Sequence, residues 1–189
     1  MKHLATSAAV LLVAAPCLAL AESGYAHGAN HCYYFQTPAG WQMDNRAAAA
    51  NGVPMVFYPK GATWQSAEVA MYTRPTSHLR PGAEAIKAQV EDVIAMYKAA
   101  SETIVARHVG PVKTHSGARG QLWAFSGYRN GGTELAVYFL GRETVNYFVA
   151  QIPGGAIIEE AKKILVELAS SYREAADCKP CAVAGSCIN

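Results

Sequence analysis

Cysteine is the residue type of this chain with the most chemical potential, and three cysteines stand in its last twelve residues, CKPCAVAGSCIN. Of the five cysteines in the sequence, Cys17 falls within the apolar N-terminal run that is expected to be removed, which leaves a set of four: Cys32, Cys178, Cys181 and Cys187. An even number of cysteines in an exported domain is typical of disulfides, and four cysteines allow three pairings. A bridge from Cys32 to the tail would close a loop of nearly the whole domain, which the chain-entropy model values at about 4 to 5 kcal/mol. We therefore expect two disulfides, with the tail stapled to the first strand.

The run Cys178-Lys179-Pro180-Cys181 also has the C-x-x-C spacing of disulfide oxidoreductases. Those enzymes place the first cysteine at a helix N-terminus, where the helix dipole lowers the pKa of the thiol. Here the motif follows a predicted helix, so the dipole would have the wrong sign. A thiol-disulfide or metal-handling function of this motif is the alternative to a structural one.

His27 and His31 suggest a second kind of chemistry, because imidazole and thiolate are suitable zinc or copper ligands and Cys32 is adjacent. The two histidines are four residues apart, as on one helical face, but Gly28 and the lack of an apolar period argue against a helix. We expect a mobile N-terminal segment here, and neither a metal nor a cofactor.

The sequence contains no recognisable catalytic constellation. Ser126 lacks the preceding glycine of a nucleophile elbow. The paired acids Glu91-Asp92 and Glu159-Glu160 fall on the solvent sides of predicted helices. The chain is therefore not expected to be an enzyme.

Aromatic and basic residues in one predicted hairpin loop, PKGATW, fit recognition of another protein. Trp64 stands near the tip of this loop with Lys60, and Tyr72, Tyr128 and Tyr138 could line an outward sheet face. Aromatic side chains bury a large area at little entropic cost, which suits an interface. The equal alternative is that Trp64 folds back on the edge of the sheet.

The first 21 residues have the pattern of a secretory signal peptide: a basic start at Lys2, an apolar stretch and an A-x-A site before Glu22. Removing 21 of 189 residues leaves 168, the length of one domain, 22–189, with a cysteine-containing C-terminal tail. We expect a periplasmic or secreted protein.

The net charge of the chain indicates which classes of partner to expect. The formal net charge is +2 for the whole chain, and one lysine leaves with the signal peptide. Nucleic acids and anionic membranes require clustered Lys and Arg, so neither is the expected partner. No later apolar run is long enough to span a bilayer, and another protein remains as the expected partner.

Hydrophobic periodicity supplies the elements that must position these residues. An alternating pattern in VPMVFYPKG (53–61) and SAEVAMYTRP (66–75) predicts two antiparallel strands joined by a hairpin loop over 59–64. Ile86, Val90 and Tyr97 recur at helical spacing in a run that follows Pro81. Four β-rich runs between 103 and 153 predict an antiparallel meander, and a closing helix is expected over 157–175. The fold class is α+β, an antiparallel β-sheet flanked by helices.

Phe35, Pro38, Gly40 and Trp41 in FQTPAGWQM end the first strand, before the hairpin, helix, meander and closing helix. In this motif and in the order of elements, residues 32–175 resemble the PsbP-like family. The resemblance implies a PsbP-like α/β/α sandwich that binds or scaffolds instead of catalysing. We therefore expect an exported, disulfide-stabilised binding or accessory module of the bacterial cell envelope.

Overall fold

The structure, a computed structural model, describes residues 22–28, 30–76, 82, 84–100, 103–128, 130–154 and 157–177. The expected signal peptide over residues 1–21 lies outside the described residues. So do the three cysteines of the tail, Cys178, Cys181 and Cys187.

The described residues form strands and helices that follow the expected order. The strands of the first half are β1 (Ser23–His27), β2 (Cys32–Gln36), β3 (Trp41–Asp44), β4 (Met55–Pro59) and β5 (Ala70–Thr76). Those of the second half are β6 (Val105–Lys113), β7 (Arg119–Ser126), β8 (Thr133–Leu140), β9 (Val145–Ile152) and β10 (Arg173–Glu174). The helices are α1 (Glu84–Ala100), α2 (Ile158–Ser170) and a short 3-10 helix, η1 (Ala49–Asn51).

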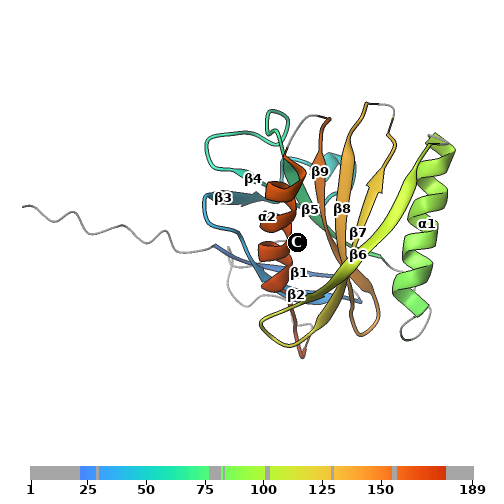
Figure 1. Ribbon diagram of the computed structural model, residues 1–189. Coiled ribbons are helices and arrows are strands. Elements are labelled where there is room, and N and C mark those ends of the chain that lie inside the picture. The colour runs from blue at the N-terminus through green and yellow to red at the C-terminus, as the bar shows by residue number, and fades with distance from the viewer. Residues whose placement is uncertain are drawn as a thin grey trace, which may run out of the picture.

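A seven-stranded antiparallel sheet in the order β3-β4-β5-β9-β8-β7-β6 forms the middle layer of the molecule. Figure 1 shows α1 on one face of this sheet and α2 on the other. A smaller sheet, β1-β2-β10, lies beside the end of α2 (Figure 1). The expected α+β sandwich with helices on both faces is confirmed, as are the β4–β5 hairpin and the β6–β9 meander.

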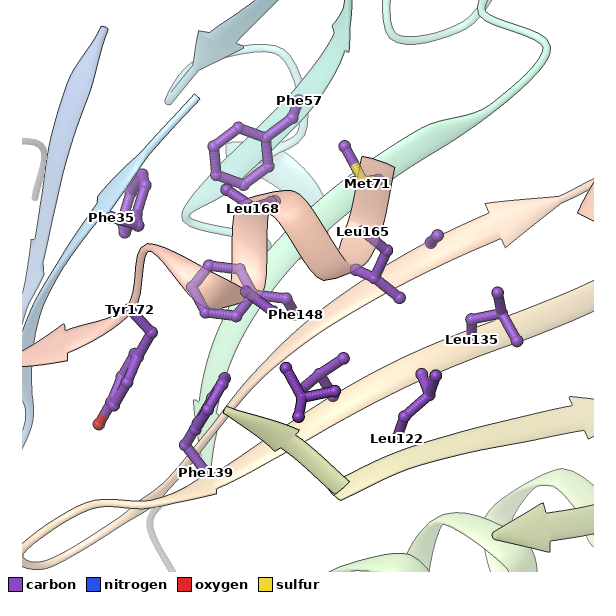
Figure 2. Close-up of a cluster of buried hydrophobic side chains, with 14 of the residues drawn as sticks. Phe35, Phe57, Met71, Leu122, Leu135, Phe139, Phe148, Leu165, Leu168 and Tyr172 are labelled. Atoms are coloured by element: carbon purple, nitrogen blue, oxygen red, sulfur yellow. The ribbon is translucent and has the colours of Figure 1, made fainter. Parts of the chain in front are cut away.

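The face of the large sheet beneath α2 is covered by apolar side chains. Helix α2 buries Leu165 and Leu168 at helical spacing, and both are completely shielded from solvent. They meet alternate residues of the central strands, among them Phe148 of β9 (Figure 2). Burial of a side chain of this size contributes about 1.5 to 3 kcal/mol, so this cluster is a principal source of stability.

The opposite face is closed by α1, which buries Ile86, Val90 and Val93 against the same strands. Because side chains alternate along a strand, β8 contributes Ala136 and Tyr138 to this side and Leu135 and Val137 to the other. The helical face that the apolar period predicts in α1 is therefore confirmed. Lys87 and Glu91, on its other side, are exposed.

The turn between β2 and β3 transfers the chain from the small sheet to the large one. Gly40 has φ of 80°, a left-handed conformation that residues with a Cβ rarely adopt, and Trp41 N–H donates to the carbonyl oxygen of Pro38 at 3.0 Å. Trp41 then opens β3 with only 8% of its surface exposed. The residues of the P-x-G-W motif thus set the direction in which the large sheet begins.

Two segments differ from expectation. The stretch before Cys32, expected to be mobile, includes β1, whose five residues pair with β2. The closing helix stops at Ser170 instead of continuing to Ala175, and the chain turns to form β10, which pairs with β2. Tyr172, expected on a helical face, is buried beyond the helix and stacks on Phe139 with ring centroids 4.4 Å apart.

None of the helices in the described part of the chain is both long enough and apolar enough to cross a membrane.

Candidate functional sites

Glu134 is the most unusual residue of the fold, because it is a carboxyl side chain buried at the interface of the sheet with α1. It lies on β8 between Phe125 of β7 and Gln151 of β9, and only 6% of its surface is exposed. It shares its face of β8 with Ala136 and Tyr138. Burial of an ionisable group needs compensating partners, so its surroundings carry information about function.

Tyrosine side chains surround this carboxyl group. The hydroxyl of Tyr97, from α1, donates a short hydrogen bond to Glu134 Oε1. The ring of Tyr97 meets that of Tyr128 edge to face, with centroids 5.4 Å apart. Tyr72 and Tyr138 also lie near enough to interact electrostatically with Glu134. We call Glu134 and these four tyrosines the tyrosine cluster.

The cluster changes the protonation of its members. Burial raises the pKa of Glu134 to about 7, and hydrogen bonds from the side chains of Tyr97 and Gln151 oppose that rise. Burial, followed by the charge of Glu134, also raises the pKa values of Tyr72 and Tyr97 well above the normal range for tyrosine. The tyrosines therefore remain neutral hydroxyls, and Glu134 is the cluster member that titrates near neutral pH.

A cavity of about 270 Å³ opens beside Glu134 at the end of the sheet where β7 turns into β8 and β9 ends. Its lining consists of Tyr128, Asn130, Gly132, Thr133, Glu134, Gln151, Ile152 and Pro153. The Asn130 side chain stays in place because its Oδ1 accepts the N–H of Gly132 at 3.0 Å. The cavity therefore combines a buried acid, two side-chain amides and an aromatic ring.

The sequence analysis did not identify Glu134. The available signal was its place in TELAVYFL, where it is the one charged residue of a strand that is apolar on both faces. Strand alternation assigns Glu134 to the face of Ala136 and Tyr138. Identifying Tyr97 as its partner requires the packing of α1 on the sheet, because 37 positions separate the two residues.

A second hollow, the α2 groove, has a volume of about 320 Å³ and lies where α2 begins. Its lining is largely apolar and comes from four elements or their ends: Trp41, Pro59, Glu68, Val69, Ile157, Glu160, Ala161 and Ile164. Its floor belongs to the α2-side core, to which Trp41 and Ala161 contribute. At its rim Ile157 is 67% exposed, an uncommon position for an aliphatic side chain of this size.

The three residues expected to bind a protein lie in two different environments. Trp64 and Tyr72 are half-buried and pack together with Val56 and Tyr58 on the α1 side of the sheet. Trp64 thus takes the alternative in which it folds back on the sheet. Lys60 is exposed and directly follows Pro59, which lines the α2 groove.

The outward tyrosine face expected from the sequence is not outward. Tyr138 is 1% exposed beneath α1, and Tyr72 and Tyr128 are half-buried on the same side. The alternation of the strands is right, but α1 covers the face that the analysis leaves open. Tyr72 is therefore a member of the tyrosine cluster and also packs against Trp64.

Cys32 and the nearby histidines occupy the small sheet. Cys32 is 3% exposed, its carbonyl oxygen accepts the N–H of Ala175 at 3.0 Å, and its sulfur lies 3.9 Å from the Ala175 carbonyl oxygen. His27 ends β1 and its ring stacks on that of Tyr25. Burial, with a contribution from nearby His27, lowers the pKa of His31.

Among the described residues, no three or more His, Cys, Asp or Glu side chains gather in an arrangement that could hold a metal ion. The tail cysteines on which the metal and redox hypotheses depend lie outside the described residues. Both hypotheses therefore remain untested predictions.

Comparison with known proteins identifies the fold. No protein-family model matches the chain, and no curated protein matches its sequence. Among solved structures, the chain resembles cyanobacterial PsbP (CyanoP) from Synechocystis sp. PCC 6803, with a TM-score of 0.55 and 14% sequence identity. The match covers 87% of this chain and 99% of that one.

A point mutant of the protein Mog1 is also similar, with a TM-score of 0.50 and 14% identity over 82% of this chain and 95% of that one. Both matches span most of each chain at an identity that shows the fold and not the activity. The chain therefore has the PsbP-like fold that its order of elements indicates.

Proposed function

Starting from the PsbP-like fold, we propose that this protein is an exported, non-enzymatic module of the bacterial cell envelope that binds another protein. The observation that carries this proposal is the α2 groove with its exposed apolar rim. Ile157 and Ile158 are 67% and 43% exposed beside a hollow that is already lined by apolar side chains. Contiguous exposed apolar surface with polar residues around it is typical of a protein-interaction site.

The charges around the α2 groove indicate what its partner looks like. Glu68 and Glu160 line the groove, and neither forms an ion pair with another described residue. An aliphatic or aromatic side chain would fill the hollow, and flanking Lys or Arg residues would complement the two carboxylates. The proposed partner is therefore a protein segment that carries an apolar anchor between basic residues.

Export and disulfide stabilisation are part of the same proposal. The strand β10 supports the disulfide, because Ala175, which follows it, is hydrogen-bonded to Cys32. Cys178 is only three residues further along the chain. Three residues span at most about 10 Å, so a chain that turns back after Ala175 can bring the Cα atom of Cys178 within the roughly 4.4 to 6.8 Å of Cys32 that a disulfide requires. Cys32 is buried, with 3% of its surface exposed. We propose a bridge from Cys32 to Cys178, which fits a structural tail better than a redox motif.

The partner is tested by photo-crosslinking from the rim of the groove in living cells. A photoreactive amino acid at Lys60 should yield one dominant adduct, and Ile157→Glu should remove it. The same probe at Lys113, on the edge strand β6, is the control and should not give that adduct. An adduct that persists in Ile157→Glu, or that consists of a second copy of this chain, would contradict the proposal.

Export and pairing are tested together on protein from the periplasmic fraction. The intact mass should correspond to a chain that starts at Glu22, and unreduced peptide mapping should link Cys32 to Cys178. A Cys178–Cys181 bridge would transfer the proposal to the redox alternative. Retention of residues 1–21 on a cytoplasmic protein would refute export.

A further inference from the structure

We propose that the cavity beside Glu134 is a binding site for a primary ammonium group on an alkyl chain. Such a group is carried by a small free amine or by a lysine side chain. The site is distinct from the α2 groove, because it lies beside Glu134 at the end of the sheet and shares no lining residue with the groove. It does not depend on the function proposed above.

The first argument is charge. Glu134 has no cationic partner among the described residues, where the one ion pair joins Lys162 to Glu159 on the surface of α2. The Arg74 guanidinium acts electrostatically on Tyr72 and Tyr147 and is not among the groups that perturb Glu134. Keeping a buried carboxylate charged is costly, and a cationic ligand beside Glu134 would reduce that cost.

The second argument is the arrangement of acceptors around the cavity. An ammonium group has three N–H donors and no acceptor. The cavity offers the carboxylate of Glu134 and the side-chain oxygens of Asn130 and Gln151. Asn130 Oδ1 already accepts one hydrogen bond from Gly132, and an amide oxygen can accept a second. Three donors and three acceptor side chains therefore match.

The remaining lining suits the alkyl chain and the charge. Ile152 and Pro153 supply apolar surface, and the ring of Tyr128 can face a cation. Cation–π contacts of this kind favour a cationic ligand. A volume of about 270 Å³ is small for an organic ligand site and fits a short amine or a single side chain.

Other ligand classes fit less well. A divalent metal requires several carboxylate, imidazole or thiolate ligands, and no such group of three exists among the described residues. An anion would be repelled by Glu134. A purely apolar ligand would leave the buried carboxyl group without a partner.

The test uses the mature full-length chain at pH 8, titrated with n-butylamine and with its neutral counterpart n-butanol. Binding is followed by the amide NMR signals of Gly132 and Thr133, which line the cavity. We expect n-butylamine to shift these signals in a saturable manner and to bind at least tenfold more tightly than n-butanol. Equal responses to the two compounds, or no saturable response to the amine, would overturn the proposal.

Two variants separate the site from general electrostatic attraction. Glu134→Gln keeps the shape of the side chain and removes its charge, and should weaken amine binding at least tenfold. Glu143→Gln removes an exposed carboxylate and should leave binding unchanged. Weakening by the second variant equal to that by the first would contradict the proposal. Should Glu134→Gln fail to fold, the comparison of amine with alcohol on the unaltered chain still decides.

The source of the ammonium group is distinguished by a second titration with Nα-acetyl-lysine amide. Binding comparable to that of n-butylamine supports a lysine side chain of a protein as the natural occupant. Binding of n-butylamine alone supports a small free amine, because the backbone groups of lysine then do not fit at the mouth of the cavity.

Discussion

The two faces of the large sheet are built from the same strands and differ in kind. Strand β8 presents Leu135 and Val137 to α2, and Glu134 and Tyr138 to α1. On the α2 side, burial of apolar surface supplies most of the stabilisation, and the buried hydroxyls of Tyr33 and Tyr172 form hydrogen bonds with Thr73 and Asn146. On the α1 side, each buried hydroxyl or carboxyl group needs a hydrogen bond, and Glu134 retains its charge near neutral pH only at a cost. The α2 side is therefore the stabilising face, and the α1 side is the face with a titrating group that borders a cavity.

The largest test of this comparison is a cavity on the α2 side. Phe148→Ala removes a side chain with no exposed surface at the centre of the apolar cluster shown in Figure 2. It should lower the free energy of unfolding by about 3 to 5 kcal/mol, as measured by urea denaturation. A loss below about 1.5 kcal/mol would show that the stabilising face has been wrongly assigned.

The next effect in size is the pH dependence of Glu134→Gln. Because burial raises the pKa of Glu134 to about 7 from 4.5, the folded state keeps a proton that the unfolded state has released between these pH values. The stability of the natural chain therefore falls as pH rises from 4.5 through 7, by about 3 kcal/mol in total. The variant lacks this loss and should be about 3 kcal/mol more stable than the natural chain at pH 8.5, and close to it at pH 4.5.

Urea denaturation at the two pH values measures this difference, with Glu143→Gln as an exposed control. The difference between variant and natural chain is the relevant quantity, because His31 adds a slope of opposite sign. Burial lowers the pKa of His31, so its contribution to stability is lost as pH falls through its normal value of 6.5. A difference independent of pH would exclude a titrating Glu134.

A smaller difference in stability is expected between the Tyr→Phe variants of two residues in the tyrosine cluster. Tyr97→Phe removes the hydroxyl that donates to Glu134 and should cost about 1 to 2 kcal/mol at pH 8, where the acceptor is charged. The matched variant Tyr128→Phe removes a buried hydroxyl that interacts with the Tyr97 hydroxyl and forms no direct hydrogen bond with Glu134, and it should cost less than Tyr97→Phe. Equal costs in thermal or urea unfolding would mean that the Tyr97 bond is not special.

The smallest effect on stability is expected at the rim of the α2 groove. Ile157→Ser changes a side chain that is 67% exposed, so the free energy of unfolding should change by less than about 0.5 kcal/mol. The same variant should nevertheless weaken the crosslink from Lys60. A marked loss of stability would indicate that Ile157 belongs to the core and not to an interface.

Elements that depend on local backbone geometry could be predicted from the sequence, and features that depend on contacts between distant segments could not. Helix α1 and the β4–β5 hairpin were predictable because their periodicities, at Ile86 and Val90 or at Met55 and Phe57, reflect local backbone geometry. The C-terminal end of α2 was not predictable from this periodicity. Tyr172 continues the apolar spacing of the helix, yet in the structure it stacks on Phe139 of a distant strand.

The candidate sites were less predictable than the fold. The sequence predicted that Lys60 and Trp64 act together because they are neighbours in one loop. In the structure Lys60 is exposed, whereas Trp64 packs against the sheet. Glu134 was not selected as a candidate, because a single acidic residue in a strand does not form a sequence motif. Its environment comes from an unrelated helix, and no local rule pairs Tyr97 with it.

By itself, the sequence determined the order and type of the elements, because helical and strand periods are properties of a few consecutive residues. It also determined which residues of each strand share a face. Only the tertiary structure decided what covers each face: α1 encloses Glu134 and its tyrosines, and α2 leaves Ile157 exposed beside a groove. It also decided that β10 brings Ala175 to Cys32. These outcomes depend on contacts between segments far apart in the chain, whose cost in chain entropy is offset only when the whole sheet and both helices pack together.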